Sequence, residues 1–218
     1  MDPVYTEDLE SGMRISIFHD EGPLNPREDG HLGTMACFHS RYNLGDKLPI
    51  EAGTPQDFLD YCYEDLGFRP AKDAVSYDDM IARISKKAII LPLYLYDHGG
   101  TTISLNKFAC KWDSGQVGWI WATHQAIRDF YTLKKLTKVA LAKALTMLQG
   151  EVEAYDEYLT GEVYGYTLTN TLGDEVDSCW GFSGYDSNPD KWYVVESARE
   201  SAMWLQRCVV SSVGTKVS

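Results

Sequence analysis

The longest regular pattern in the chain is a run of apolar residues spaced alternately four and three positions apart. It comprises Leu141, Leu145, Leu148, Val152, Tyr155 and Leu159. This spacing places all six residues on one face of an α-helix. Between Leu133 and Leu159 there is no proline and the only glycine is Gly150, so we expect one continuous helix. The pattern is too short to predict a coiled coil, so we favour packing on a sheet over a homodimer seam.

Shorter apolar runs predict strands before this helix and a β-hairpin after it. The expected strands are 14–18, 34–39, 88–96, 101–105 and 117–122, and the expected hairpin is 162–169 with 176–182. Further helices are expected at 55–66, after Ser76, at 124–131 and at 196–208. Because strands and helices do not alternate regularly, we predict an α+β fold. In it, a mixed or antiparallel sheet packs with one long and several short helices.

The 218 residues allow one domain or two small ones, and we expect a single α+β domain over residues 13–208. Residues 1–12 are expected to form a flexible arm and residues 209–218 a loose tail. The segment 19–33 is rich in glycine and proline, which favours a long loop. A loop of this length inside a domain is either functional or mobile.

The chain is acidic, with 32 Asp and Glu against 20 Lys and Arg and a net charge of −12. This balance argues against direct nucleic-acid binding and against attachment to anionic membranes. The longest apolar run, 88–96, is too short to span a bilayer. The N-terminus has no basic segment followed by an apolar one, so we expect a cytoplasmic protein.

The acidic residues are concentrated in one part of the sequence. Residues 151–190 contain ten Asp and Glu and no Lys or Arg, whereas lysines dominate the first half of the long helix. That order opposes the helix dipole, so it points to a role in binding. The predicted binding residues are Glu151, Glu153, Asp156, Glu157, Glu162, Asp174, Glu175, Tyr155, Tyr158, Tyr164 and Trp180. The alternative is an ordinary solvated surface, with the aromatic residues in the core.

Chemically capable side chains also lie at the ends of predicted strands. They are His19 and Asp20, Asp97 and His98, and Asp113. If the strands at 14–18 and 88–96 were parallel neighbours, these groups could converge to bind a metal or perform acid–base catalysis. Antiparallel strands would separate them, and ordinary turns have the same composition. No known catalytic or metal-binding motif is present, so we predict no metal and no cofactor and favour a binding protein over an enzyme.

The five cysteines are scattered without a C-x-x-C pair. They are Cys37, Cys62, Cys110, Cys179 and Cys208. In a cytoplasmic protein this pattern predicts free thiols, most of them buried as small apolar side chains.

Six segments together resemble a family of accessory proteins carried by bacteriophages, prophages and other mobile elements. They are HDEGPLNPRED (19–29), LGTMACFHSRYNLGD (32–46), LPLYLYDHGG (91–100), CKWDSGQVGWIWAT (110–123), YDEYLTGEVYGY (155–166) and DSCWGF (177–182). The resemblance implies a biological context, and it assigns no activity and no site residue.

Charge and context together suggest a protein that binds a host protein with a basic surface. The expected action is inhibition of a host defence system of restriction or CRISPR type, by protein contact or by local mimicry of nucleic acid. The alternative is a metal-dependent hydrolase or nucleotide-processing enzyme that uses the histidines and aspartates at strand ends.

Overall fold

The computed structural model describes residues 2–28, 30–48, 53–68 and 76–214, the last six of these without their side chains. Eight strands and five helices lie among these residues, and all strand pairs are antiparallel, which confirms the predicted α+β class. The chain forms two compact units. We call Met1–Leu24 with Gly161–Ser218 the split unit, and Asn25–Thr160 the inserted unit.

This organisation differs from the single domain that we expected over residues 13–208. Each unit has its own four-stranded sheet and its own hydrophobic core. The expected flexible arm contains strand β1 (Tyr5–Asp8). Helix α5 (Tyr193–Gly214) extends through most of the expected loose tail, and residues 215–218 lie outside the described part of the chain.

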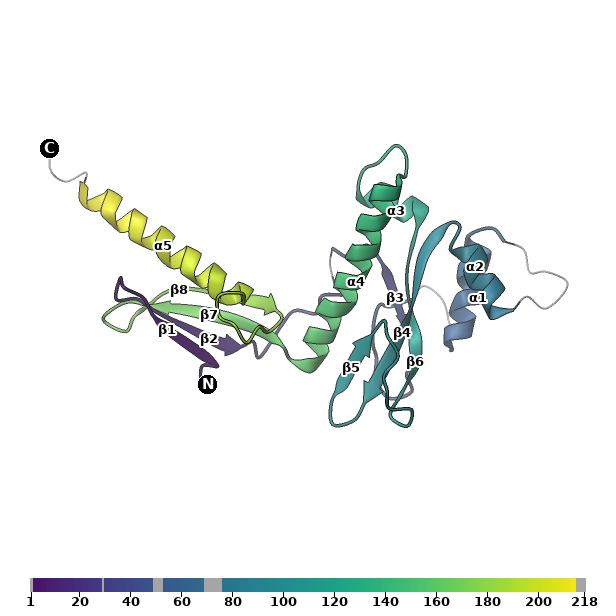
Figure 1. Ribbon diagram of the computed structural model, residues 1–218, viewed down its shortest axis with the longest axis horizontal. Coiled ribbons are helices and arrows are strands. Elements are labelled where there is room, and N and C mark those ends of the chain that lie inside the picture. Colours follow the sequence, from purple (N-terminus) through teal and green to yellow (C-terminus); the bar gives the residue numbers. More distant parts are fainter. Residues whose placement is uncertain (1, 29, 49–52, 69–75, 215–218) are drawn as a thin grey trace. The chain divides into compact units, whose positions relative to one another are not determined.

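The sheet of the split unit has the strand order β1-β2-β7-β8. Strand β2 spans Arg14–His19, β7 spans Val163–Thr169 and β8 spans Glu175–Ser183. Helix α5 covers one face of this sheet (Figure 1). Because side chains alternate across a strand, β2 and β7 each send every second residue into the core beneath α5. These core residues are Ile15, Ile17, Tyr164, Tyr166 and Leu168, and they pack with Trp192, Val194, Val195, Ala198 and Ala202.

Contacts with α5 and its preceding turn explain why the N-terminal segment is ordered as a strand. The ring of Tyr5 packs edge-on against Trp192, with 6.5 Å between ring centroids. Glu7 accepts hydrogen bonds from Nε of Arg199 in α5, at 3.0–3.1 Å. Each of these partners is close to 190 positions away in the sequence, so local patterns could not predict the strand.

The inserted unit is built on a second sheet, of order β3-β6-β4-β5. Its strands are β3 (Thr34–Cys37), β4 (Ala88–Asp97), β5 (Thr101–Ser104) and β6 (Ser114–Thr123). Helices α1 (Pro55–Asp65) and α2 (Tyr77–Ile84) cover one face, and α4 (Lys138–Thr160) covers the other (Figure 1). The short helix α3 (His124–Phe130) follows β6 directly.

Helices are present at the positions expected from the sequence, and capping residues mark where α1 and α2 begin. Thr54 accepts a hydrogen bond from the backbone N–H of Asp57, whose side chain binds the Thr54 N–H in return. The long helix α4 begins later than expected, because the Thr137 hydroxyl caps the N–H of Ala140.

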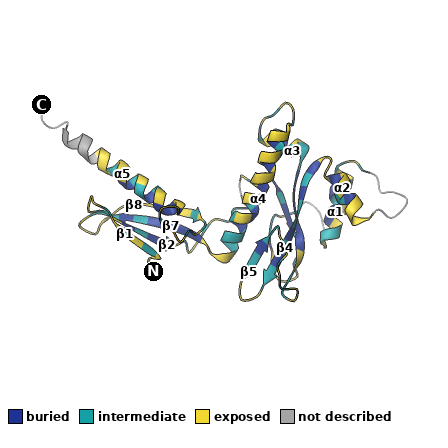
Figure 2. Ribbon diagram, viewed as in Figure 1, coloured by how far each residue is buried: buried dark blue, intermediate teal, exposed yellow. Residues whose placement is uncertain are grey.

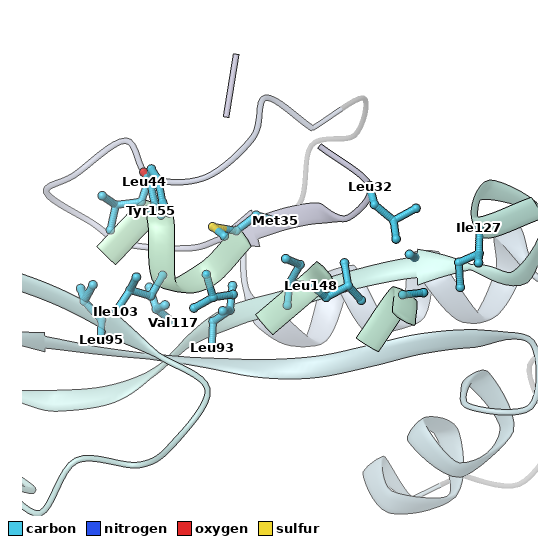
Figure 3. Packing of buried hydrophobic residues seen from close by; sticks show 14 residues of the cluster. Leu32, Met35, Leu44, Leu93, Leu95, Ile103, Val117, Ile127, Leu148 and Tyr155 are labelled. Atoms are coloured by element: carbon cyan, nitrogen blue, oxygen red, sulfur yellow. The ribbon is translucent and has the colours of Figure 1, made fainter. Parts of the chain in front are cut away.

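The apolar face of α4 matches the predicted stripe only in its second half. Leu148, Val152 and Tyr155 are buried in the core between α4 and the sheet, and Figure 3 shows Leu148 and Tyr155 there. In the first half, Ala140 and Ala144 face the core, and Leu145 is exposed. The small alanines let the helix approach the sheet closely. Gly33 serves the same purpose, because a Cβ at this position would lie 2.3 Å from Leu148.

One buried cation joins three parts of the inserted unit. The side chain of Arg27 is 2% exposed and forms a two-point ion pair with Asp46, with bonds of 2.7 and 2.8 Å. It also donates to Glu151 of α4 at 2.9 Å. The two carboxylates in turn accept backbone N–H groups, Asp46 from Met35 in β3 and Glu151 from Leu32. The guanidinium of Arg27 thereby connects the loop between β2 and β3 with strand β3 and helix α4.

Replacing Arg27 with methionine should destabilise the protein by about 3–5 kcal/mol, because two carboxylates would remain buried without their cation. The measurement is urea-induced unfolding followed by far-ultraviolet circular dichroism. Arg14→Met, which removes an exposed ion pair with Asp8, is the control and should leave the unfolding midpoint nearly unchanged. An Arg27→Met protein as stable as the wild type would contradict the assignment.

The split unit should fold after removal of the inserted unit. Its core residues all belong to its own two segments. His19 at the end of β2 pairs directly with Tyr164 near the start of β7, so the chain leaves the split unit and returns to it at neighbouring positions of one sheet. We expect a chain that joins Leu24 to Gly161 through a short Gly-Ser linker to unfold cooperatively and to give a dispersed amide NMR spectrum. A spectrum typical of an unfolded chain would show that the split unit depends on the inserted one.

Candidate functional site

The acidic stretch of the sequence is divided between the two units. Glu151, Glu153, Asp156 and Glu157 belong to α4 of the inserted unit, and the predicted binding residues from Glu162 onward belong to the split unit. Of the predicted acidic residues, Glu153, Glu162, Asp174 and Glu175 are exposed. The structure therefore provides no single unit that carries the whole predicted surface.

Two acidic residues of α4 have internal roles. Glu151 has a side chain only 9% exposed and pairs with Arg27. Asp156 is half-buried and accepts a hydrogen bond of 2.7 Å from the backbone N–H of Ile103 in the edge strand β5. These contacts explain why Glu151 and Asp156 are carboxylates despite the unfavourable dipole. Glu157 is half-buried as well.

The predicted aromatic residues also separate into two groups. Tyr155 and Tyr164 are buried, and the hydroxyl of Tyr155 accepts a hydrogen bond from the Gly45 backbone. Tyr158 is half-buried and stacks on Tyr155. Trp180 in β8 is partly exposed and lies over Gly165, where a Cβ would collide with the indole. Only Trp180 among the four therefore offers a large exposed surface.

Sequence reasoning missed an exposed face of α5 that combines aromatic and acidic side chains. Tyr193 and Trp204 are 64% and 63% exposed, and Glu196 and Glu200 between them are exposed as well. Helical spacing places these four residues on the side of α5 opposite its buried residues Val194, Val195, Ala198 and Ala202. Figure 2 shows exposed and buried residues of α5 in different colours. We call the four exposed residues the α5 face. The spacing of three, four and four residues was the available signal, because it places them together on a helix.

The net charge is distributed unevenly over the two units. The split unit contains 14 acidic and 5 basic residues, a net charge of −9. The inserted unit contains 18 acidic and 15 basic residues, a net charge of −3. Most of the net negative charge of the chain therefore belongs to the unit that carries the α5 face.

The predicted convergence of His19 and Asp20 with Asp97 and His98 required parallel neighbouring strands. Strands β2 and β4 instead belong to different sheets, and every strand pair is antiparallel. His19 lies at the end of β2, where its ring contacts Tyr164. Asp20 follows it, and its carboxylate accepts the Gly22 N–H. Neither strand pairing nor a shared sheet brings these two residues to Asp97 and His98.

Asp97, His98 and Asp113 do come together, at one end of the inserted unit's sheet. Both β3 and β4 run antiparallel to β6, so the ends of β3 and β4 lie beside the start of β6. The loops at this end enclose a cleft of about 320 Å³. Its lining comprises Phe38, His39, Arg41, Leu95, Asp97, Trp112, Asp113, Ser114, Gly115, Gln116 and Val117.

The charged groups of the cleft are already partly paired. Arg41 forms an ion pair of 2.5 Å with Asp97, and the Tyr42 hydroxyl donates to the other oxygen of the same carboxylate. Nδ1 of His98 lies 3.3 Å from Oδ2 of Asp113, and the Cys110 thiol lies 3.7 Å from the same oxygen. The carboxylate therefore lies between the thiol and the imidazole. A cysteine nucleophile would require the imidazole in that central position.

Among the residues that the structure describes, no group of three or more His, Cys, Asp or Glu side chains could hold a metal ion. No helix in the described ranges is long and apolar enough to cross a membrane. Comparisons of the chain with protein-family models, with curated proteins and with solved structures found no match.

The cysteines should differ sharply in reactivity. Cys62 is fully buried, and burial raises the pKa of its thiol. Burial and the Asp46 carboxylate raise the pKa of Cys37 to about 12. Cys179 and Cys208 are exposed, whereas we expected most of the cysteines to be buried. Because the thiolate is the reactive form, a disulfide reagent at neutral pH should modify Cys179 and Cys208 first, as peptide mass spectrometry would show.

After denaturation, all five thiols should react. Rapid modification of Cys62 in the native protein would contradict the burial of this α1 residue in the core.

Proposed function

We propose that this protein acts by binding a partner protein with a basic surface, and that the α5 face is the centre of the interface. The proposal rests on the position of exposed Tyr193 and Trp204 beside Glu196 and Glu200 on one face of α5, in the unit that has a net charge of −9. Tyrosine and tryptophan are favoured anchors at protein interfaces. An acidic field accelerates encounter with a basic partner.

The tip of the β7–β8 hairpin adds charge beside the same helix. Val176 of β8 and Leu205 of α5 line one cavity of about 630 Å³. Asp174 and Glu175, which directly precede Val176, are exposed and were predicted as binding residues. Leu205 packs toward the core, so the hairpin tip lies on the sheet-facing side of α5. We propose these two carboxylates as a flank of the interface and the α5 face as its centre.

The resemblance to proteins of phages and other mobile elements favours a host protein as the partner. A basic surface is typical of proteins that bind nucleic acid, which include restriction and CRISPR-type defence enzymes. Carboxylates of the α5 face and the hairpin would then occupy positions that phosphates of the nucleic acid normally take. Inhibition of such an enzyme follows if this contact covers its nucleic-acid site.

The test is capture of host proteins by the immobilised full chain, quantified by mass spectrometry. We expect about tenfold less of the specific partner, or still less, to be captured by the variant Tyr193→Ser/Glu196→Gln/Glu200→Gln/Trp204→Ser. The reason is that aromatic anchors and buried charges dominate interface energy. All four positions are exposed, so the variant should remain folded. Capture by the wild type should weaken as salt rises, since salt screens exposed charges.

A matched control removes similar groups from the inserted unit. Asp60→Asn/Glu64→Gln/Tyr77→Ser changes two exposed acids and one exposed aromatic residue on α1 and α2, and it should capture the partner as the wild type does. Equal losses in both variants, or no loss in the α5 variant, would refute the proposed interface.

A further inference from the structure

The cleft at the end of the inserted unit's sheet contains a second arrangement of groups suited to binding. The guanidinium of Arg41, which lines the cleft, lies 5.6 Å from the ring centroid of Tyr42 and pairs with the Asp97 carboxylate. In such an arrangement the aromatic ring packs against the planar face of the guanidinium, and the carboxylate accepts hydrogen bonds from its N–H groups. The protein thus uses this chemistry for one of its own arginines.

Trp112 and Asp113 offer the same two groups a short distance away. The indole of Trp112 is 96% exposed, although burying a side chain of this size would ordinarily be favourable. Oδ2 of Asp113 is contacted by His98 and Cys110, whereas Oδ1 accepts no hydrogen bond from any residue that the structure describes. The Asp113 side chain is 39% exposed, so a flat aromatic surface and a carboxylate are both accessible at the cleft.

The charge and size of the cleft restrict which kind of ligand it can bind. Two carboxylates and one guanidinium line it, which leaves a net negative charge. Nδ1 of His39 lies 3.3 Å from the backbone N–H groups of both Arg41 and Tyr42 and accepts from them. A cation is favoured over an anion. A volume of about 320 Å³ is at the lower end of ligand sites and suits one amino-acid side chain better than a nucleotide.

We propose that this cleft binds the guanidinium group of an arginine residue from another protein, with Trp112 against its face and Asp113 as its counter-ion. A guanidinium is favoured over an ammonium group because it is planar, weakly hydrated and able to donate a fork of N–H groups. The site belongs to the inserted unit and includes no residue of the α5 face, so it goes beyond the function proposed above.

The test uses the full chain and acetyl-Gly-Arg-Gly-amide as the probe, measured by isothermal titration calorimetry. We expect saturable binding at one site, weaker binding of the lysine peptide, and no measurable binding of the citrulline peptide, which keeps the shape without the charge. Free arginine should bind more weakly than the peptide. Tighter binding of free arginine, or of guanosine monophosphate, would overturn the assignment to a protein arginine.

Two variants locate the site. Asp113→Asn should weaken binding of the arginine peptide about tenfold or more, because a charge-assisted hydrogen bond is lost. Trp112→Ala should weaken it about threefold, as expected for an exposed cation–π contact. The exposed position of Trp112 means that this variant tests the proposal even if Asp113→Asn impairs folding, which thermal unfolding would reveal.

The controls separate this site from the proposed interface. Asp60→Asn, an exposed acid in the same unit, and Trp204→Ala, in the α5 face, should both bind the arginine peptide like the wild type. Wild-type affinity in both Asp113→Asn and Trp112→Ala would overturn the proposal and leave the α5 interface unaffected. Loss of partner capture in the α5 variant, conversely, says nothing against the arginine site.

Discussion

The inserted unit depends on the burial of one cation. Arg27 holds Asp46, beside β3, and Glu151, in α4, and both carboxylates also bind backbone N–H groups. Removing a charge from water is costly unless its partners are well placed, so each of the three groups requires the other two. Their positions fix how α4 lies on the sheet, and with it the core around Leu148 and Tyr155. They also fix β3, whose end forms one wall of the cleft.

The division of the chain separates two kinds of binding surface. The split unit carries most of the net charge and exposes the aromatic and acidic α5 face, which suits a broad contact with a basic protein. The inserted unit is nearly neutral in charge balance and has a small polar cleft with one exposed indole. We infer that the protein is organised for recognition, with affinity from the α5 face and a more selective contact from Trp112 and Asp113.

Local patterns predicted most elements, because their causes are local. The capping box at Thr54 and Asp57 and the β7–β8 hairpin follow from residues a few positions apart. Contacts between distant residues could not be predicted in this way. Glu151 resembles a surface acid until Arg27 is placed beside it. Asp97 and Asp113 share a cleft because β4 pairs with β6, whereas sequence reasoning considered β4 beside β2. The two-unit division was hidden because the paired strands β2 and β7 are far apart in sequence.

Hydrogen exchange of the full chain, measured alone and saturated with its purified captured partner, would show whether α5 forms the interface. Backbone amides that become buried in an interface exchange more slowly, and mass spectrometry locates them along the sequence. We predict slower exchange over residues 193–204 of α5 and at the tip of the β7–β8 hairpin. Unchanged exchange in α5 with slowing confined to the inserted unit would contradict the assignment of the interface to the α5 face.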